Sequence, residues 1–252
     1  MKLRLYDWCR ARNYFRRARV GFDYGRFDLD LVDFVQHEMF VCGCYEPATL
    51  ALFETLVETG ANVIDVGANV GQYAIAAARL SGDKGRVVAV EPNPQVCAKL
   101  IDNVRLNNFE NRIAVVTTPM SDRGKLLTFG MPDERALGTT RLKRPDEDSG
   151  FVAQASTIAE LAAQLNLDRI DVLKIDVEGH DLQVIDGALS NATARPAHIL
   201  FEYIHESFDY GVAADAIESR FAALGYSLAT IDGAPYAPGR IIPEGNLWAR
   251  RR

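Results

Sequence analysis

The stretch 62-NVIDVGANVGQYAIAAARL-80 decides the fold of this chain. A short apolar run at 62–66 leads into two glycines, Gly67 and Gly71, and then into a helical pattern. A strand, a glycine turn and a helix place backbone N–H groups and a helix N-terminus at the carboxyl end of a parallel sheet. The sequence therefore predicts a nucleotide-like ligand at this turn.

Side chains around the turn indicate the charge of that ligand. The spacing departs from the dinucleotide pattern G-x-G-x-x-G, because Asn69 stands where the middle glycine would be. Asp65 comes two residues before Gly67, where a carboxylate would repel a pyrophosphate but attract a ligand such as S-adenosylmethionine, which carries an ammonium and a sulfonium. Glu91 ends the next apolar run and could bind ribose hydroxyls. The alternatives are a helix-capping Asp65 and a surface-charged Glu91.

Apolar runs rich in Val and Ile alternate with helical patterns along most of the 252 residues. This alternation predicts one α/β domain with a parallel sheet and helices on both faces. The main strands are expected at 62–66, 86–90, 112–116, 170–175 and 197–203, with further strands at 125–129, 151–156, 225–231 and 246–250. The helices are expected near 47–58, 69–80, 93–107, 157–166, 180–189 and 211–224. The polar segment between 130 and 150 is expected to be a loop that borders a pocket.

Composition narrows the classes of partner. A net charge of −6 argues against a general nucleic-acid binder. The sequence has no apolar run of the roughly 20 residues that would span a bilayer, and no signal-peptide core follows Met1, so we expect a cytoplasmic protein. The four scattered cysteines predict no disulfide framework. Residues 1–44 begin with an arginine-rich segment that we expect to form a helical arm, which could pack on the domain, bind an acidic partner or join copies in a homo-oligomer.

Five segments follow one another in a characteristic order: VIDVGANVGQY, VVAVEPNP, SD-x-G at 121–124, LKIDVEGHDLQVIDGAL and ILFEY. Over about residues 45–205 they resemble the FkbM family of class I S-adenosylmethionine-dependent methyltransferases. The resemblance implies that residues 45–252 form a Rossmann-like, seven-stranded, mostly parallel sheet of order 3-2-1-4-5-7-6, with the last strand antiparallel. It also implies O-methylation of a hydroxyl on a sugar, a glycan or a natural product.

The resemblance assigns roles to single residues. The family's methionine-end turn matches Asp65, Gly67, Asn69 and Gly71, with Tyr73 in the same motif. Its ribose carboxylate matches Glu91, followed by Pro92 and Asn93, and its adenine-side pair matches Ser121 and Asp122. Tyr45-Glu46-Pro47 resembles the family's Y-E-P element, in which Glu46 would reach the ligand's amino group. From the residues alone, a simple turn at Asp122 remains open.

Acidic residues and histidines follow the fourth and fifth main strands. Because side chains alternate along a strand, those of Asp176 and Glu178 should leave the sheet on one side. We expect a catalytic cluster around the accepting hydroxyl, with one member as its base: Asp176, Glu178, His180, Glu202 and His205. The alternatives are helix capping by Glu178, pairing of Asp176 with Lys174, and ordinary surface histidines. The three carboxylates could bind Mg²⁺, but their spacing is not diagnostic and no metal is expected.

These observations favour an S-adenosylmethionine-dependent O-methyltransferase. Two alternatives stay open. An NAD-dependent oxidoreductase fits the strand–turn–helix, although Asp65 and Asn69 argue against it. A non-catalytic interaction module that binds S-adenosylmethionine fits the basic N-terminus, although the acidic cluster argues against it.

Overall fold

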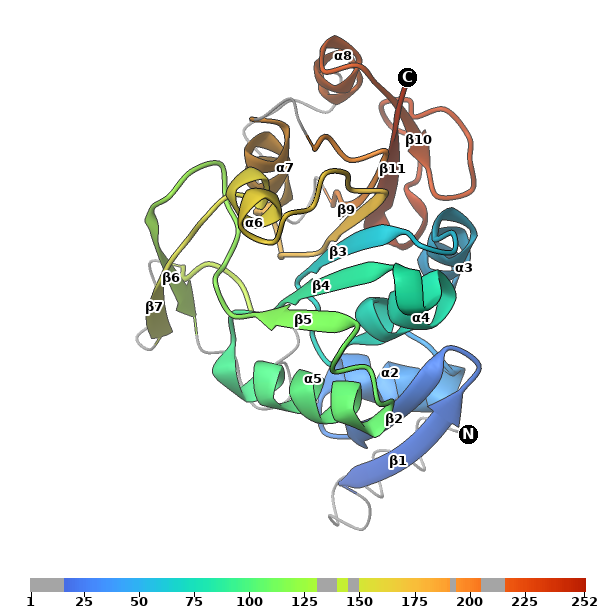
Figure 1. The fold of residues 1–252 in the computed structure, drawn as a ribbon. Helices are drawn as coiled ribbons and strands as arrows, with labels where there is room; N and C mark the ends of the chain where they lie inside the picture. The colour runs from blue at the N-terminus through green and yellow to red at the C-terminus, as the bar shows by residue number, and fades with distance from the viewer. Residues whose placement is uncertain (1–15, 131–139, 145–149, 191–193, 205–215) are drawn as a thin grey trace.

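A seven-stranded sheet forms the centre of the molecule (Figure 1). The computed structural model describes residues 16–130, 140–144, 150–190, 194–204 and 216–252. The strand order is β10-β11-β9-β8-β3-β4-β5. The strands are β3 (Asn62–Val66), β4 (Arg86–Val90), β5 (Ile113–Val116), β8 (Val172–Ile175), β9 (His198–Glu202), β10 (Tyr226–Thr230) and β11 (Asn246–Arg251). Only β11 runs antiparallel to its neighbours in this sheet. Numbered along the chain, the order is 3-2-1-4-5-7-6, which confirms the predicted architecture.

Helices cover both faces of the sheet, because the side chains of each buried strand alternate between two cores. Along β3, Ile64 and Val66 pack into one core and Val63 into the other. The first core receives α6 (Ile158–Gln164), α7 (Asp181–Leu189) and α8 (Ile217–Ala223). The second receives α2 (Phe34–Cys42), α3 (Pro47–Leu56), α4 (Gln72–Ser81) and α5 (Pro94–Leu106). The helices expected near 47–58, 69–80, 93–107, 157–166 and 180–189 are confirmed within a few residues; residues 211–215 of the last one lie outside the described part.

A small second sheet stands beyond the β5 edge (Figure 1). Its two antiparallel strands are β6 (Leu126–Gly130) and β7 (Gly150–Gln154). The rings of Phe129 and Phe151 stack with their centroids 5.0 Å apart. This sheet confirms the two extra strands expected around the polar segment, and its buried Leu127 and Phe129 face the cavity described below.

The N-terminal segment differs from the prediction. Residues 17–30 form a hairpin of β1 (Arg17–Phe22) and β2 (Gly25–Asp30), so the expected helical arm is wrong for this stretch. The reason is the period of the sequence: in RARVGF, exposed arginines alternate with partly buried apolar residues, which is a strand pattern. The hairpin packs on α5, where the backbone N–H of Asp28 donates to Asn103 Oδ1 at 2.8 Å.

The sequence predicts an arginine-rich arm at the start of the chain and no membrane-spanning segment. The first 15 residues, which hold three of the seven arginines of residues 1–44, lie outside the described residues. No helix within the described ranges has the length and apolar character needed to cross a membrane.

Candidate active site

Two glycines shape the turn after β3. Gly67 has φ +81°, and a Cβ built on it would lie 1.8 Å from the backbone oxygen of Asp176. The loops after β3 and β8 therefore touch at a place that only glycine can occupy. Gly71 has φ +98° at the start of α4, and a Cβ there would lie 2.7 Å from Leu100 Cδ1.

A first cavity opens beside this turn, and we call it the methionine-side cavity. Its volume is about 530 Å³, with open solvent at its mouth included. Its wall includes several polar side chains: Tyr45, Asp65, Asn69, Tyr73, Lys174 and Asp176. Among the described residues, Asp65 Oδ2 and Asn69 Oδ1 are buried and have no hydrogen-bond partner. A buried acceptor without a donor costs about 1–3 kcal/mol, so these two oxygens indicate a ligand that carries donors, such as an ammonium.

The carboxyl of Asp65 has a raised pKa, so it can lose a proton when a cation binds beside it. Burial raises its pKa to about 7, and the charge of Asp176 adds to the rise. Lys174 and a hydrogen bond from the Ala74 backbone oppose it. That bond reaches the first turn of α4, as the helix-capping alternative predicts, but it leaves Oδ2 available. A cation bound at Oδ2 would therefore lower the pKa and release a proton near neutral pH.

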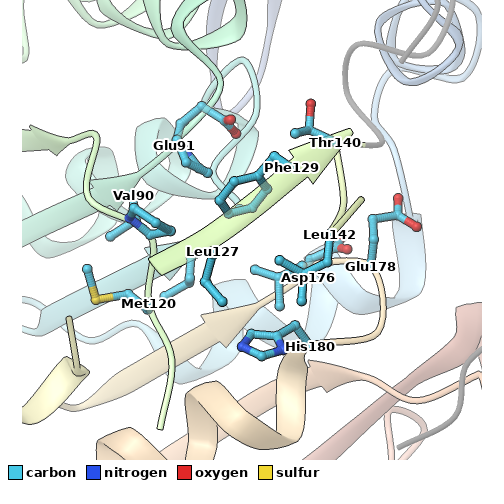
Figure 2. A pocket seen from close by; sticks show the side chains of 15 residues that line it. Val90, Glu91, Met120, Leu127, Phe129, Thr140, Leu142, Asp176, Glu178 and His180 are labelled. Atoms are coloured by element: carbon cyan, nitrogen blue, oxygen red, sulfur yellow. The ribbon is translucent and has the colours of Figure 1, made fainter. Parts of the chain in front are cut away.

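A second cavity of about 560 Å³, open solvent included, lies on the other side of the turn, and we call it the ribose-side cavity. Figure 2 shows Glu91 and His180 facing it, with Leu127, Phe129 and Leu142 around them. Glu91 accepts hydrogen bonds from the backbone N–H groups of Asn69 at 3.0 Å and Asn93 at 2.9 Å. Burial nevertheless raises its pKa to about 7.

The two cavities meet where the β3 and β8 loops cross. Gly67, Asp176 and Glu178 line both of them. The predicted cofactor residues divide between the two: Asp65, Gly67, Asn69 and Tyr73 on the first, and Gly67, Glu91 and Pro92 on the second. Asn93 caps α5 by accepting from Gln95 N and donates to Thr140 Oγ1 at 2.8 Å, so it fastens residue 140 to the cavity rim.

His180 belongs to the ribose side by its contacts. Its Nε2 lies 2.8 Å from Ser121 Oγ, and Ser121 donates to Asp122 Oδ1 at 2.9 Å. Lys125 Nζ completes the chain at 2.6 Å from the same Asp122 oxygen. Burial, assisted by Lys125, lowers the pKa of His180 to about 4, so its ring is neutral and weakly basic at pH 7. The catalytic role expected for His180 stays a prediction. Its observed contact is with Ser121, on the ribose side of the site.

The predicted carboxylates do come together. The pKa of Glu202 is raised to about 9, first by burial and then by the charges of Asp176, Asp181 and Glu178. The pKa of Glu178 is raised to about 7 by burial and by Asp176. Asp176 and Glu178 line both cavities, whereas Glu202 lines neither of the two and is linked to them through the effect of their charges on its pKa. The catalytic roles of all three stay predictions. His205 lies outside the described residues.

Lys174 sits inside this acidic cluster. Its side chain is fully buried, and its Nζ lies 3.7 Å from Asp176 Oδ2, as the ion-pair alternative predicts. Nζ also donates to the Ile175 backbone oxygen at 3.2 Å and to Asn246 Oδ1 at 3.3 Å. In the described part of the chain, no group of three His, Cys, Asp or Glu residues is arranged to hold a metal ion.

Three further residues belong to the site and were not singled out from the sequence. Lys174 was considered only as an ion-pair partner. Tyr45 lines the methionine-side cavity, held there because Gln72 bonds both its N–H and its carbonyl, at 2.7 and 2.8 Å. Asp181 is the buried first residue of α7; its Oδ2 accepts from Gly179 N at 3.2 Å. In a sequence, an aspartate at a helix start indicates a cap, so no local signal distinguishes Asp181 from a surface residue.

Replacing Asp181 with asparagine is expected to remove a pH-dependent loss of stability. Burial and the charge of Asp176 raise the pKa of Asp181 to about 7, above its unfolded value. The folded state therefore holds an extra proton between about pH 4 and pH 7, and the stability linked to that proton is lost as pH rises through this window. From pH 4 to pH 8, Asp181→Asn should gain about 4 kcal/mol relative to the wild type in urea unfolding, because each of about three pKa units contributes about 1.4 kcal/mol.

The exposed Asp23 provides the matched control, because Asp23→Asn removes a carboxylate that lies in water. Its stability relative to the wild type should stay constant with pH. An equally constant difference for Asp181→Asn would contradict the raised pKa.

Comparison with known proteins is consistent with this geometry. The sequence model of the "Methyltransferase FkbM domain" matches residues 65–228. "Methyltransferase 1" of Beauveria bassiana is 23% identical over 207 residues, which cover 75% of this chain and 80% of that protein. "Hexuronic acid methyltransferase AglP" of Haloferax volcanii is 26% identical over 145 residues, 58% of this chain and 56% of that protein. A solved S-adenosylmethionine-dependent O-methyltransferase from Thermotoga maritima covers 94% of this chain and 86% of its own, at 12% identity and a TM-score of 0.47.

The family match spans most of the chain, and the site suits the family's cofactor. The unpartnered Asp65 Oδ2 and Asn69 Oδ1 offer acceptors to an ammonium, and Gly67 beside them lines both cavities. Glu91 presents a fixed carboxylate for ribose hydroxyls. The chain therefore belongs to the FkbM family and is an S-adenosylmethionine-dependent methyltransferase.

Proposed function

We propose that the protein methylates a hydroxyl of a sugar, a glycan or another small natural product. One observation carries this proposal: the carboxylates of Asp176 and Glu178 line the place where the methionine-side and ribose-side cavities meet. A cofactor held by Asp65 on one side and by Glu91 on the other would have its sulfur between these two anchors. In that placement, Asp176 and Glu178 would lie beside the reacting centre.

The cluster can supply what an alcohol acceptor needs. S-adenosylmethionine, when bound, supplies an electrophilic methyl group on a positively charged sulfur. A hydroxyl attacks well only as it loses its proton, and a carboxylate with a raised pKa is a better proton acceptor than an ordinary one. Glu202 has the highest raised pKa of the cluster, about 9. A cation nearby lowers that pKa, so we infer that Glu202 ionises when the site is filled and then takes the hydroxyl proton.

The acceptor class rests on the relatives. The Haloferax volcanii protein named above acts on a hexuronic acid, which supports a sugar acceptor here. A role in homo-oligomer formation or partner binding for the N-terminal segment, residues 1–44, stays a prediction.

A transfer assay tests the proposal. The protein would be incubated with S-adenosylmethionine labelled on its methyl group and with a panel of neutral sugars, uronic acids, glycans and natural-product alcohols. We expect label on a hydroxyl, as a methyl ether that survives mild alkali. A product that mild alkali hydrolyses would identify a carboxyl acceptor instead. Cofactor binding without transfer to any acceptor would support the non-catalytic module.

Glu202→Gln is expected to separate catalysis from cofactor binding. Glutamine keeps the size of the side chain but cannot take a proton from the acceptor. The rate constant kcat should fall by about 100-fold or more, within the range of general-base contributions, while the Kd for S-adenosylmethionine stays within about twofold. Glu218→Gln, on the exposed side of α8, is the control and should leave both values unchanged. A Glu202→Gln enzyme as active as the wild type would remove Glu202 from the catalytic cluster.

A further inference from the structure

We propose that Glu244, in the loop between β10 and β11, is a positioning residue for the amino-acid end of the cofactor. It acts through Glu46, Tyr73 and Lys174, and it lies 198 positions after Glu46 in the sequence. The proposal rests on the placement of S-adenosylmethionine described above. Three sets of contacts support it.

The first set concerns the start of helix α3. Glu46 is the N-cap of this helix, yet its backbone is left-handed, with φ +50°, and its carboxylate makes no cap hydrogen bond. Glu244 provides the cap instead. Its two carboxylate oxygens accept from Ala48 N at 3.0 Å, and from Thr49 N and Thr49 Oγ1, both at 2.8 Å. These bonds satisfy N–H groups that a helix start leaves open, and a negative charge is favourable there.

The second set shows what this exchange allows Glu46 to do. Relieved of capping, its carboxylate accepts from Tyr73 Oη at 3.0 Å and from Asn246 Nδ2 at 2.7 Å. Tyr73 lines the methionine-side cavity together with Asp65. Glu46 therefore stands directly behind a wall of the cavity and orients its tyrosine. This refines the expectation that Glu46 itself reaches the ligand.

The third set extends the arrangement to Lys174. The Asn246 amide donates to Glu46 Oε1 and to the Glu244 backbone oxygen, the latter at 3.0 Å, while its Oδ1 accepts from Lys174 Nζ at 3.3 Å. All three bonds fix one orientation of the amide. Glu244 itself has φ +53°, a strained value for a residue other than glycine. One loop thus holds both the cap of α3 and the amide that bridges Glu46 to Lys174.

The contacts predict a loss confined to one end of the cofactor. Without the Glu244 carboxylate, the carboxylate of Glu46 is the nearest cap for its own helix, and turning to that role would release Tyr73 and Asn246. The wall of the methionine-side cavity would then loosen. Glu91 and Ser121 are held by other elements, through Asn69, Asn93 and His180, so the adenosine end should keep its shape.

Calorimetry with two ligands tests this directly. S-adenosylhomocysteine has the amino-acid end, whereas 5′-methylthioadenosine has the same adenosine and sulfur without it. We expect Glu244→Ala to weaken S-adenosylhomocysteine about tenfold or more and to leave 5′-methylthioadenosine within twofold. Glu244→Gln, which keeps one acceptor oxygen, should recover most of the lost affinity. Glu218→Ala is the control and should change neither ligand.

Each outcome decides the matter. An unchanged affinity for both ligands, or an equal loss for both, would overturn the proposal, the second result because it indicates a general structural role. If Glu244→Ala does not fold, Glu244→Gln replaces it, and about a threefold weakening of S-adenosylhomocysteine alone is then the expected result. The wild type separates this proposal from the one on which it rests: a wild type that bound neither ligand would contradict the placement of the cofactor itself.

Discussion

Gly67→Ala is expected to reduce cofactor affinity by more than about 100-fold, and it should also lower the unfolding temperature by several degrees. A methyl group at this position would lie 1.8 Å from the backbone oxygen of Asp176, and φ is +81°. Backbone cannot swing aside as a side chain can, so the β3 and β8 loops would have to separate. Those loops carry residues of both cavities. Calorimetry with S-adenosylhomocysteine and thermal unfolding measure the two effects.

Gly225 offers a matched control for the backbone conformation. Its φ is +84°, but a Cβ there would meet nothing within 4 Å. Gly225→Ala should therefore show only the cost of the left-handed conformation, about 1–2 kcal/mol, with the Kd for the cofactor unchanged. If the two variants lost equal stability and both kept their affinity, the close contact at Gly67 would have no functional consequence.

Asp65→Asn is expected to weaken S-adenosylmethionine at least tenfold at pH 7.5, which exceeds the contribution of an exposed ion pair. Asparagine keeps the shape of the side chain and its acceptor toward Ala74, but it has no charge for the ammonium. The wild type should also release a proton on binding, because Asp65 has a pKa of about 7 in the free protein and a lower one beside a cation. Its affinity should therefore rise with pH up to about 7.

Calorimetry in buffers of different ionisation enthalpy counts the released protons. Asp65→Asn should release about one proton fewer than the wild type at pH 6.5, while Glu91, whose pKa is also raised to about 7, keeps its own contribution. Asp23→Asn, which removes an exposed carboxylate, should match the wild type. Unchanged affinity and proton release in Asp65→Asn would reject its role at the ammonium.

Local patterns predicted the sheet and its first turn well. The run at 62–66 and the glycines that follow it are neighbours in sequence, and Glu91 directly follows the next strand, so their arrangement follows from strand and helix geometry. The hairpin at 17–30 differs from the predicted helical arm because the arginines of its first strand recur with a period of two, and this period favours a strand whatever the composition. In RARVGF that period places the charges on the exposed side of a strand.

Contacts between distant segments were beyond what local patterns show. Ser121 and His180 are 59 residues apart, and Glu244 caps helix α3 by accepting from Thr49, which lies 195 residues earlier in the chain. Each side chain taken alone resembles an ordinary polar surface residue, and only the packing of the sheet brings the partners together. The raised pKa values of Asp65 and Glu202 cannot be predicted from local sequence either. Burial is their largest cause, and burial depends on the whole fold.

The most direct measurement of the central claim is a crystal structure of the protein with S-adenosylhomocysteine. The account predicts the ligand's ammonium within hydrogen-bond distance of Asp65 Oδ2 and Asn69 Oδ1, its ribose hydroxyls on Glu91, and its sulfur between the two cavities near Asp176 and Glu178. Density for the ligand elsewhere, or a ribose far from Glu91 with the Asp65 oxygen still lacking a donor, would contradict it.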